Sequence, residues 1–423
     1  MIAPDVGGSF GAKARPYPED ILLPWLARRV GRPVRWTPDR SQDMVGLGHG
    51  RAQIQDVALG GRRDGTLEAL SVRVLVDAGA YPQVGAMLGR NTGVLAPGPY
   101  RIGSVHWELT SVVTTTTPTT AYRGAGRPEA TALLERAIDL FAGEVAIDPA
   151  ELRRRNLIGA DEFPYTTPTE LVYDSGDYRR GLDLALEVAG YADLRAEQQR
   201  RRAAADPVQL GIGLATFIDR TSGVPGAEYG SVELRADGSA LVRTGSNPYG
   251  QGHHTSWAML VADRTGIPMD RIEVLHGDTD VIPKGGITGG SRSVQKAGSA
   301  VAAAAELLVA RARDVTADLL EASGADVVVD VGGGGLHVAG TPARLVTWEQ
   351  VAAALPSDEL RCEAEVDVSS SFPSGAYVAV VEVEVETGMV RLRRLVTVDD
   401  AGAILNPLLA AGQIHGGAAQ GVA

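Results

Sequence analysis

Residues 51–81 alternate apolar and polar side chains on both sides of the segment 62–65, RRDG. This alternation directs one strand face to a core and the other to solvent, so it predicts a β-hairpin with RRDG as its turn. Residues 105–117 predict another strand, and 31–40 suggest a strand that enters a turn. Helices are predicted over 19–30, where Pro24 interrupts an amphipathic pattern, over 148–158, and within 121–145 after a glycine-rich turn that leads to Pro128.

The second half of the chain resumes this mixture after an extended, proline-rich segment at 161–178 and two short helices. No internal repeat with a fixed period is present. The pattern therefore predicts an α+β fold of two mixed α/β domains, 1–160 and 209–423, joined by a crossover and linker at 161–208. In the second domain we predict strands within 211–219, 230–246 and 271–280, a hairpin at 375–402, and helices at 253–266 and 293–322.

Charge and cysteine content narrow the functional classes. The 423 residues carry a formal net charge of −12 without a basic stripe, which argues against a nucleic-acid surface. The most basic patch, 195–202, is typical of a solvated helix end. The single cysteine, Cys362, cannot build a disulfide, a four-cysteine zinc site or an iron–sulfur cluster within the chain, and its surroundings predict a buried strand position. Without a signal peptide or a long apolar run, we expect a soluble cytoplasmic protein.

Glycine is frequent, with 52 residues scattered among apolar segments, and five short segments are rich in it. The segments are VGGSFGAK (6–13), AYRGAGR (121–127), NPYGQGHH (247–254), GGITGGSRS (285–293) and GQIHGGAAQG (412–421). None of them has the context of a dinucleotide-binding fingerprint, and no P-loop motif occurs. Turn glycines alone are one interpretation. The alternative is a set of loops whose backbone amides approach an anionic ligand.

These segments, in this order and spacing, resemble the molybdenum-cofactor-binding large subunit of the xanthine dehydrogenase/aldehyde oxidase family. The resemblance covers essentially the whole chain and is strongest to the carbon monoxide dehydrogenase large-subunit-like branch. It implies a molybdopterin dinucleotide, usually the cytosine form in bacterial members, bound between the two domains. The molybdenum would be held through the pterin, with no direct protein ligand.

The resemblance also implies site residues. In the first segment, Gly7, Gly8, Phe10 and Gly11 would lie beside the metal centre. In the second, Ala121 would line the cofactor and Arg123 would orient the substrate, whereas Arg127 would form structural salt bridges. The remaining cofactor contacts would come from the last three segments: Gly250, Gln251, Gly252, Gly289, Gly290, Ser291, Arg292, Ser293 and Gln413, the last in a cofactor-lining turn.

The three histidines in these segments are expected to be structural. His253 and His254 are adjacent and must point to different sides, which suits helix-cap or surface positions better than metal ligands. His415 is likewise expected to be structural. The sequence departs from the family at two positions next to Arg123. Gly124 replaces the cysteine of copper-dependent carbon monoxide enzymes, so carbon monoxide oxidation is not expected, and Ala125 replaces a substrate-stacking aromatic residue, which disfavours xanthine.

The family's catalytic base is a glutamate in a GExG-type loop, and no such loop occurs before residue 423. We expect an internal fragment, a split-gene product or a truncated sequence. None of Glu129, Glu135 and Glu233 matches the position of the base, and none is assigned to it. A second polypeptide would have to supply the missing segments, and the isolated chain is expected to bind little cofactor.

The resemblance implies oxidative hydroxylation of an aldehyde, an N-heterocycle or a related small organic substrate, with water as the oxygen source. The implied partners are an iron–sulfur subunit with a [2Fe–2S] cluster and an FAD subunit, and neither a nucleic acid nor a membrane span is expected. Two alternatives remain open at this point. One is a non-catalytic remnant or scaffold that retains the cofactor-domain fold, and the other is a nucleotide-binding protein of unrelated fold.

Overall fold

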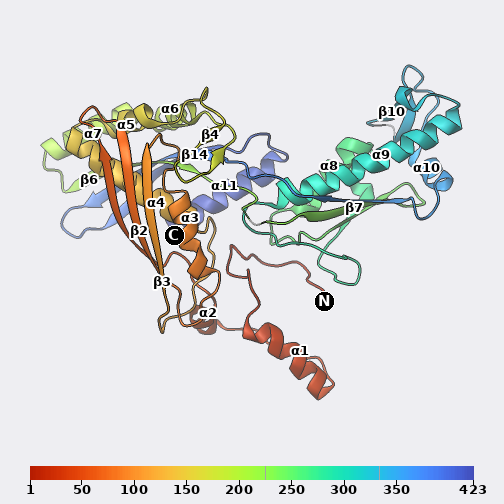
Figure 1. Cartoon of the computed structure of the whole chain (residues 1–423), viewed down its shortest axis with the longest axis horizontal. Coiled ribbons are helices and arrows are strands. Elements are labelled where there is room, and N and C mark those ends of the chain that lie inside the picture. The colour runs from red at the N-terminus through yellow and green to blue at the C-terminus, as the bar shows by residue number, and fades with distance from the viewer. Residues whose placement is uncertain (224, 333) are drawn as a thin grey trace.

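A computed structural model describes residues 1–223, 225–332 and 334–423 and shows two lobes side by side (Figure 1). The first lobe contains the predicted hairpin, formed by β1 (Gln53–Gly61) and β2 (Leu67–Asp77). The strand β3 (Ser104–Val112) adds to β2 in parallel and completes a three-stranded sheet. Three helices belong to this part of the lobe. The helix α3 (Gly85–Val94) packs on β2 and β3, α4 (Arg127–Val145) packs on β1, and α5 (Pro149–Asn156) packs on α4.

A second sheet of the first lobe is built from strands that lie far along the chain. Its order is β15 (Val390–Asp400), β14 (Ser374–Glu384) and β6 (Val208–Ile218), with antiparallel pairs throughout. The helices α6 (Tyr178–Ala189) and α7 (Tyr191–Ala203) pack on it, and a two-stranded ribbon, β4 (Tyr165–Thr166) and β5 (Val172–Tyr173), lies between the helical segments. One hydrophobic core unites both sheets, so packing joins residues from both sides of position 208.

The second lobe has its own core beneath a four-stranded sheet of order β13-β7-β8-β9. The strands are β7 (Glu228–Leu234), β8 (Ala240–Thr244), β9 (Ile272–Leu275) and β13 (Arg361–Val366). The helices α8 (His253–Thr265) and α9 (Ser299–Leu320) cover it, and the π-helical turn η2 (Ser293–Gly298) leads into α9. A small distal unit contains the strands β10 (Val327–Asp330), β11 (Gly335–Val338) and β12 (Val346–Thr347) and the helix α10 (Trp348–Ala354). The short helical turns η1 (Met269–Arg271) and η3 (Gly324–Asp326) come directly before β9 and β10. Cys362 is buried in β13, which confirms its predicted position.

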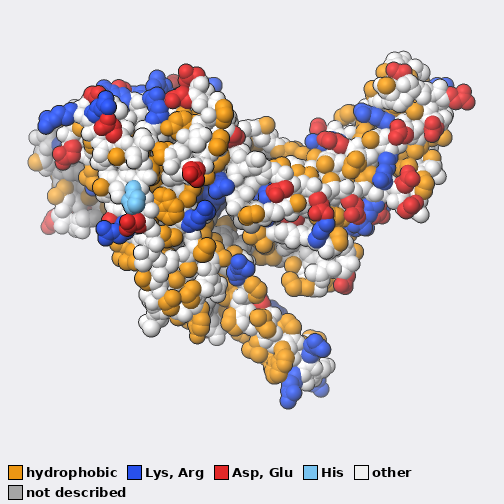
Figure 2. All heavy atoms as spheres, in the orientation of Figure 1, with side chains coloured by type: hydrophobic (Ala, Val, Ile, Leu, Met, Phe, Trp, Pro, Cys, Tyr) orange, Lys and Arg blue, Asp and Glu red, His pale blue; other side chains and the backbone are white. Residues whose placement is uncertain are grey.

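The helix α1 (Pro18–Val30) extends away from both lobes, at the bottom of Figure 1. It runs continuously through Pro24, so the predicted interruption is wrong. None of its residues is buried, and Figure 2 shows hydrophobic side chains on its surface, which include Ile21 and Trp25. Because the helix lies in solvent, the donor that Pro24 lacks leaves no buried carbonyl unsatisfied.

Two further sequence predictions are wrong. The segment 31–40 is not a strand: it runs as irregular chain to α2 (Arg40–Gly46), because no neighbouring strand pairs with it among the residues described. The glycine-rich segment 412–421 is not a turn but lies within the helix α11 (Pro407–Val422). Asn406 caps this helix by accepting a hydrogen bond from the Leu409 amide, and Pro407 occupies its first turn, so these start signals outweigh the low helix propensity of glycine.

Candidate active site

The N-terminal glycine-rich loop packs directly on the loop that contains Arg123. A Cβ atom at Gly11 would lie 2.4 Å from the carbonyl oxygen of Ala121, so only glycine permits this approach. Gly11 also has a φ of +113°, a conformation that side chains rarely adopt. Phe10 lies next to this contact with a φ of +52°, and its ring packs over Gly8 and remains half exposed. The first two segments therefore meet at one point.

The loop 121–127 is fixed by hydrogen bonds and ion pairs of two arginine side chains, Arg51 and Arg127. Arg51 donates hydrogen bonds to the carbonyl oxygens of Tyr122 (3.3 Å) and Arg123, and it forms an ion pair with the buried Glu129 (3.2 Å). Glu129 in turn accepts a hydrogen bond from the Gly126 amide (2.8 Å) where α4 begins. Arg127 forms an ion pair with Asp219 and donates to the carbonyl oxygen of Gly124 (2.9 Å). The expectation that Arg127 forms salt bridges is confirmed.

Arg123 crosses from this loop to helix α11. Its Nη2 atom donates to the backbone oxygen (2.7 Å) and to the side-chain Oε1 atom (3.0 Å) of Gln413, and Nη1 donates to Gln420 (3.3 Å). Cβ atoms at Gly416 and Gly417 would lie 3.6 Å from the guanidinium group. The glycines of α11 thus provide a surface without side chains on which Arg123 lies.

The segment 247–254 contacts the same helix. A Cβ atom at Gly252 would lie 2.6 Å from the Leu409 side chain, so α11 packs against the backbone where α8 begins. Gln251 folds back within the segment and accepts a hydrogen bond from the Tyr249 amide (2.5 Å). His253 is the first residue of α8; its Nδ1 atom lies 3.1 Å from the Ser246 carbonyl oxygen, and burial lowers its pKa. His254 is exposed on the other side, as two adjacent histidines require.

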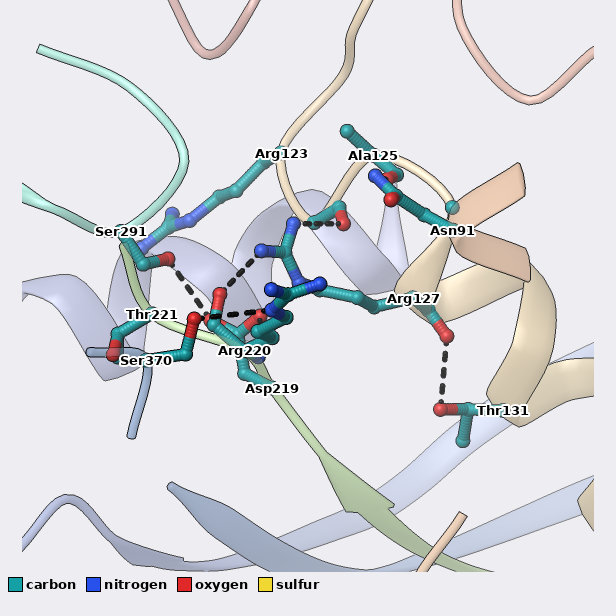
Figure 3. Close-up of polar contacts among 12 residues, drawn as sticks. Asn91, Arg123, Ala125, Arg127, Thr131, Asp219, Arg220, Thr221, Ser291 and Ser370 are labelled. Carbon is teal, nitrogen blue, oxygen red and sulfur yellow. Dashed lines mark hydrogen bonds and ion pairs between the residues drawn. The ribbon is translucent and has the colours of Figure 1, made fainter. Parts of the chain in front are cut away.

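The segment 285–293 closes the arrangement (Figure 3). Two of its hydroxyl groups contact Ser246, the residue before the segment 247–254. The Oγ atom of Ser246 lies 3.0 Å from the Oγ1 atom of Thr288 and 3.2 Å from the Oγ atom of Ser293. Ser291 donates to Asp219 (2.9 Å), the carboxylate that also pairs with Arg127. Direct contacts thus link 121–127 to α11 and α11 to 247–254, and Ser246 and Asp219 connect 285–293 to 247–254 and to 121–127. The segment 6–13 joins this ring at the contact of Gly11 with Ala121. The five segments 6–13, 121–127, α11, 247–254 and 285–293 are hereafter called the five-segment ring.

Arg292 is buried and already neutralised within the protein. Its Nη2 atom lies 3.0 Å from Glu228, and the two side chains are 4% and 1% exposed. Its Nε atom is buried without a hydrogen-bond partner in the described part of the chain. Arg292 can thus offer one N–H donor to a ligand, but most of its charge is compensated by Glu228.

The ring contains two glycines with free space beside them and two buried polar side-chain atoms without a partner among the described residues. No described atom lies within 4 Å of the Cβ positions of Gly7 and Gly250. The Oδ1 atom of Asn247, like the Nε atom of Arg292, is buried without a hydrogen-bond partner among the residues described. The unpaired N–H group of Arg292 and the unpaired carbonyl of Asn247 fit a polar ligand that carries both anionic oxygens and N–H groups.

The three acids that lack a motif position are all engaged with arginines. Glu129 pairs with Arg51, as described above. Glu135 pairs with Arg153 (2.8 Å) and Glu233 pairs with Arg243 (2.5 Å). No group of three His, Cys, Asp or Glu side chains that could hold a metal occurs among the described residues. Each of the three acids is therefore engaged in an ion pair of the scaffold.

Sequence reasoning missed the dipeptide Asp219–Arg220, which joins three parts of the site. Asp219 pairs with Arg127 and accepts from Ser291, while Arg220 accepts a hydrogen bond from Arg127 through its carbonyl oxygen and donates to Ser370 (3.1 Å), as Figure 3 shows. Burial and the charge of Arg127 lower the pKa of Arg220. A polar pair directly after the apolar strand β6 was the available signal.

Comparison with known proteins identifies the family of the chain. Residues 1–157 and 184–423 each match the family described as molybdopterin cofactor-binding domain. Over 99% of its length the chain is 34% identical to 6-hydroxypseudooxynicotine dehydrogenase complex subunit gamma of Paenarthrobacter nicotinovorans, 54% of which is covered. It is also 34% identical to the carbon monoxide dehydrogenase large chain of Hydrogenophaga pseudoflava, with 100% of this chain and 55% of that protein covered. The chain belongs to the molybdopterin cofactor-binding domain family.

Solved molybdenum hydroxylase structures have the same fold. Quinoline 2-oxidoreductase from Pseudomonas putida 86 superposes with a TM-score of 0.91 at 30% identity, over 98% of this chain and 56% of that one. Cu,Mo-CO dehydrogenase in its carbon monoxide reduced state gives 0.90 at 31% identity, over 98% and 55%. The chain spans about half the length of the relatives it matches. The α+β class with two molybdopterin-binding domains is confirmed, and an unrelated nucleotide-binding fold is excluded.

Molybdopterin is a phosphorylated pterin, and it has the properties that the five-segment ring requires of a ligand. Its phosphate offers anionic oxygens to a donor such as the Arg292 Nε–H group, and its pterin ring offers N–H groups to an acceptor such as the Asn247 Oδ1 atom. In the part of the chain that the structure describes, no helix is both long and apolar enough to cross a membrane. The family assignment and the ring therefore agree on the class of ligand.

Proposed function

We propose that the chain is the cofactor-binding part of a molybdenum hydroxylase that inserts an oxygen atom from water into a C–H bond of a small organic molecule. The observation that carries this proposal is the closure of the five-segment ring through Arg123 and Gln413. The proposed ligand is a molybdopterin dinucleotide, in the cytosine form. Its contacts would come from Gly7, Gly8, Phe10, Gly11, Ala121, Gly250, Gln251, Gly252 and the segment 289–293.

When bound, the cofactor supplies the oxygen transfer and accepts the two electrons of the reaction. The chain's own residues bind and orient. The backbone at Gly7 and Gly250 has room for an approaching ligand, and Arg292 offers its unpaired N–H group. Arg123 is fixed by Gln413 and Gln420 through Nη1 and Nη2, so its guanidinium is positioned before substrate arrives and can stabilise negative charge on a substrate oxygen. We assign no catalytic base, since Glu129, Glu135 and Glu233 are all ion-paired.

We infer an N-heterocycle as the substrate class. Relatives named for nicotine, 6-hydroxypseudooxynicotine and quinoline support this class. Carbon monoxide oxidation is disfavoured because Gly124 follows Arg123 and the single cysteine of the chain lies in the core of the second lobe. A non-catalytic scaffold is less well supported, because a structural role alone would not require a closed ring with unpaired polar atoms directed at no protein group.

The relatives' names, which include a complex subunit and large chains, support additional subunits. We propose an iron–sulfur subunit with a [2Fe–2S] cluster and an FAD subunit as electron acceptors. The chain should therefore be co-expressed with its genomic neighbours and purified as a complex. We expect molybdenum by mass spectrometry, released cytosine nucleotide, and ¹⁸O from labelled water in the product of an N-heterocycle. A complex without molybdenum and pterin would refute the proposal.

A further inference from the structure

A second cavity lies in the first lobe, apart from the five-segment ring. Its volume is about 290 Å³, and it is formed by the start of α6, the end of β6, the start of β14 and the end of β15 with the turn that follows. Apolar walls come from Leu184, Phe217, Val398 and Ile404. The size suits a small organic molecule, and the walls suit its apolar part.

Carboxylates dominate the polar lining of this cavity. Asp177, Asp399 and Asp400 line it together with a single cation, Arg180. Within the described chain, none of these three carboxylates takes part in an ion pair. Asp399 accepts a hydrogen bond from the Tyr377 hydroxyl (2.8 Å), and Asp400 accepts from the Gly402 amide (3.0 Å). Asp177 accepts from the backbone amide of Arg180 (3.1 Å) as the cap of α6. The cavity is therefore lined by more negative than positive side chains, next to apolar walls.

Tyr178 provides an independent sign that a ligand is missing. It lines the cavity, its side chain is 4% exposed, and its hydroxyl has no hydrogen-bond partner among the described residues. A buried hydroxyl without a partner is costly, and natural proteins rarely leave one so. Burial and the negative charges of Asp174 and Asp400 raise the pKa of Tyr178, so the group stays a neutral hydroxyl near Asp400. Its oxygen can accept a hydrogen bond from a donor in the cavity.

We propose that this cavity binds a small organic ammonium ion, such as a primary alkylamine in its protonated form. The ammonium group would donate to Asp399, Asp400 and the Tyr178 hydroxyl, and the alkyl part would pack on Phe217 and Val398. The Phe217 ring adds a favourable face for a cation. An inorganic cation is disfavoured because much of the wall is apolar, and because the cluster does not qualify as a metal site among the residues described. Partial burial raises the pKa of Asp399, and the hydrogen bond from Tyr377 opposes this shift.

The test is calorimetric titration of the full chain with n-butylammonium chloride at constant ionic strength, with sodium butyrate as the matched anion. We expect saturable binding of the amine and weaker or no binding of butyrate. Asp399→Asn should weaken the amine about tenfold, because it removes the charge and keeps the shape. Tyr178→Phe should weaken it about threefold without loss of fold, because the hydroxyl has no partner to lose. Asp358→Asn, an exposed turn position, is the charge-matched control and should bind as the wild type does.

Equal weakening by Asp399→Asn and Asp358→Asn would overturn the proposal, because only the overall charge would then matter. Binding of butyrate as tight as that of the amine, or no saturation with the amine, would overturn it as well. None of these results depends on molybdenum content, so failure of this site and failure of the proposed enzymatic function are distinguishable.

Discussion

The guanidinium group of Arg123 bonds both oxygens of Gln413, the backbone oxygen at 2.7 Å and the side-chain oxygen at 3.0 Å, across 290 positions of the chain. One residue comes from the loop before α4 and the other from α11. Only a fixed distance between these elements allows one nitrogen to reach both oxygens. The pair therefore reports directly on closure of the five-segment ring.

A double-mutant cycle should detect this closure. Arg123→Met and Gln413→Ala are each expected to lower the free energy of unfolding, with a coupling energy of about 0.5–1.5 kcal/mol, because a charged donor then loses its acceptor in a partly exposed setting. Urea unfolding followed by circular dichroism measures all four forms. Gln420→Ala, whose contact with Arg123 is longer at 3.3 Å, is the internal comparison and should couple more weakly. Strictly additive effects of Arg123 and Gln413 would show that the contact does not form in solution.

Gly11 should not tolerate a side chain, whereas Gly7 in the same loop should. Gly11→Ala places a Cβ atom 2.4 Å from the Ala121 oxygen at a φ of +113°, and we expect a loss of about 2–3 kcal/mol or displacement of the loop. Gly7→Ala meets no described atom within 4 Å and should change stability by less than about 0.5 kcal/mol. Thermal unfolding of the two variants compares them directly. Equal melting temperatures would contradict the observed approach of the two loops.

The sequence predicted those parts of the fold that depend on local pattern. The hairpin β1–β2, the start of α4 after a glycine-rich turn and the buried strand position of Cys362 all follow from side-chain alternation or start signals within a few residues. The segment 31–40 failed because its alternation has no partner strand, which no local pattern reveals. The helix at 412–421 was missed because its capping residues, Asn406 and Pro407, lie before the glycines that suggested a turn.

Long-range packing was beyond the sequence for a different reason. The strand β6 joins β14 across more than 150 positions and shares a core with β2, so the lobe boundaries do not follow the order of the chain. For the site, the motifs identified Arg123 and Gln413 as members of candidate segments, but they did not predict that the two side chains contact each other. The partner of Arg292 was also invisible, since Glu228 lies in a strand 64 positions earlier without any motif around it. Pairing of this kind depends on three-dimensional proximity.

A buried network centred on Arg153 should dominate the stability of the first lobe. Arg153 is 0% exposed, pairs with Glu135 and Asp139 at 2.8 Å each, and donates to the carbonyl oxygen of Leu214 in β6 (3.1 Å). Arg153→Met would leave Glu135 charged and buried, so we expect a loss of about 3–5 kcal/mol in urea unfolding.

Arg154→Met is the adjacent control for this network. Arg154 pairs with Asp183 at the surface, and its removal should cost less than about 1 kcal/mol. Replacing both members of the buried pair, Arg153→Met with Glu135→Leu, should recover part of the loss because no unpaired charge remains. A double variant that is less stable than Arg153→Met alone would show that the pair contributes through geometry and not through charge compensation.

His276 links helix α8 to the segment that precedes the first glycine-rich loop. Its Nε2 atom lies 2.5 Å from the Nε2 atom of His254. The next residue, Gly277, accepts a hydrogen bond from the Ala3 amide (2.7 Å), and Asp278 forms a β-bridge with Ile2. Burial and the neighbours His254 and His253 lower the pKa of His276 below its ordinary value of 6.5, while Asp5 opposes them.

Because the folded state holds His276 at a lowered pKa, the unfolded state binds more protons below pH 6.5, and the free energy of unfolding should fall as the pH decreases from 6.5. Stability from this group is complete above that pH. His276→Gln should flatten the slope between pH 6.5 and 5 by up to about 1.4 kcal/mol per pH unit, whereas the exposed His106→Gln should leave it unchanged. Urea unfolding at several pH values gives the slopes, and the protection factor of the Ala3 amide against hydrogen exchange should fall as the pH decreases over the same range in the wild type alone. If His276→Gln has the same slope as the wild type, other groups cause the loss of stability in acid. The attachment of residues 2–3 would then not depend on the pair of His254 and His276.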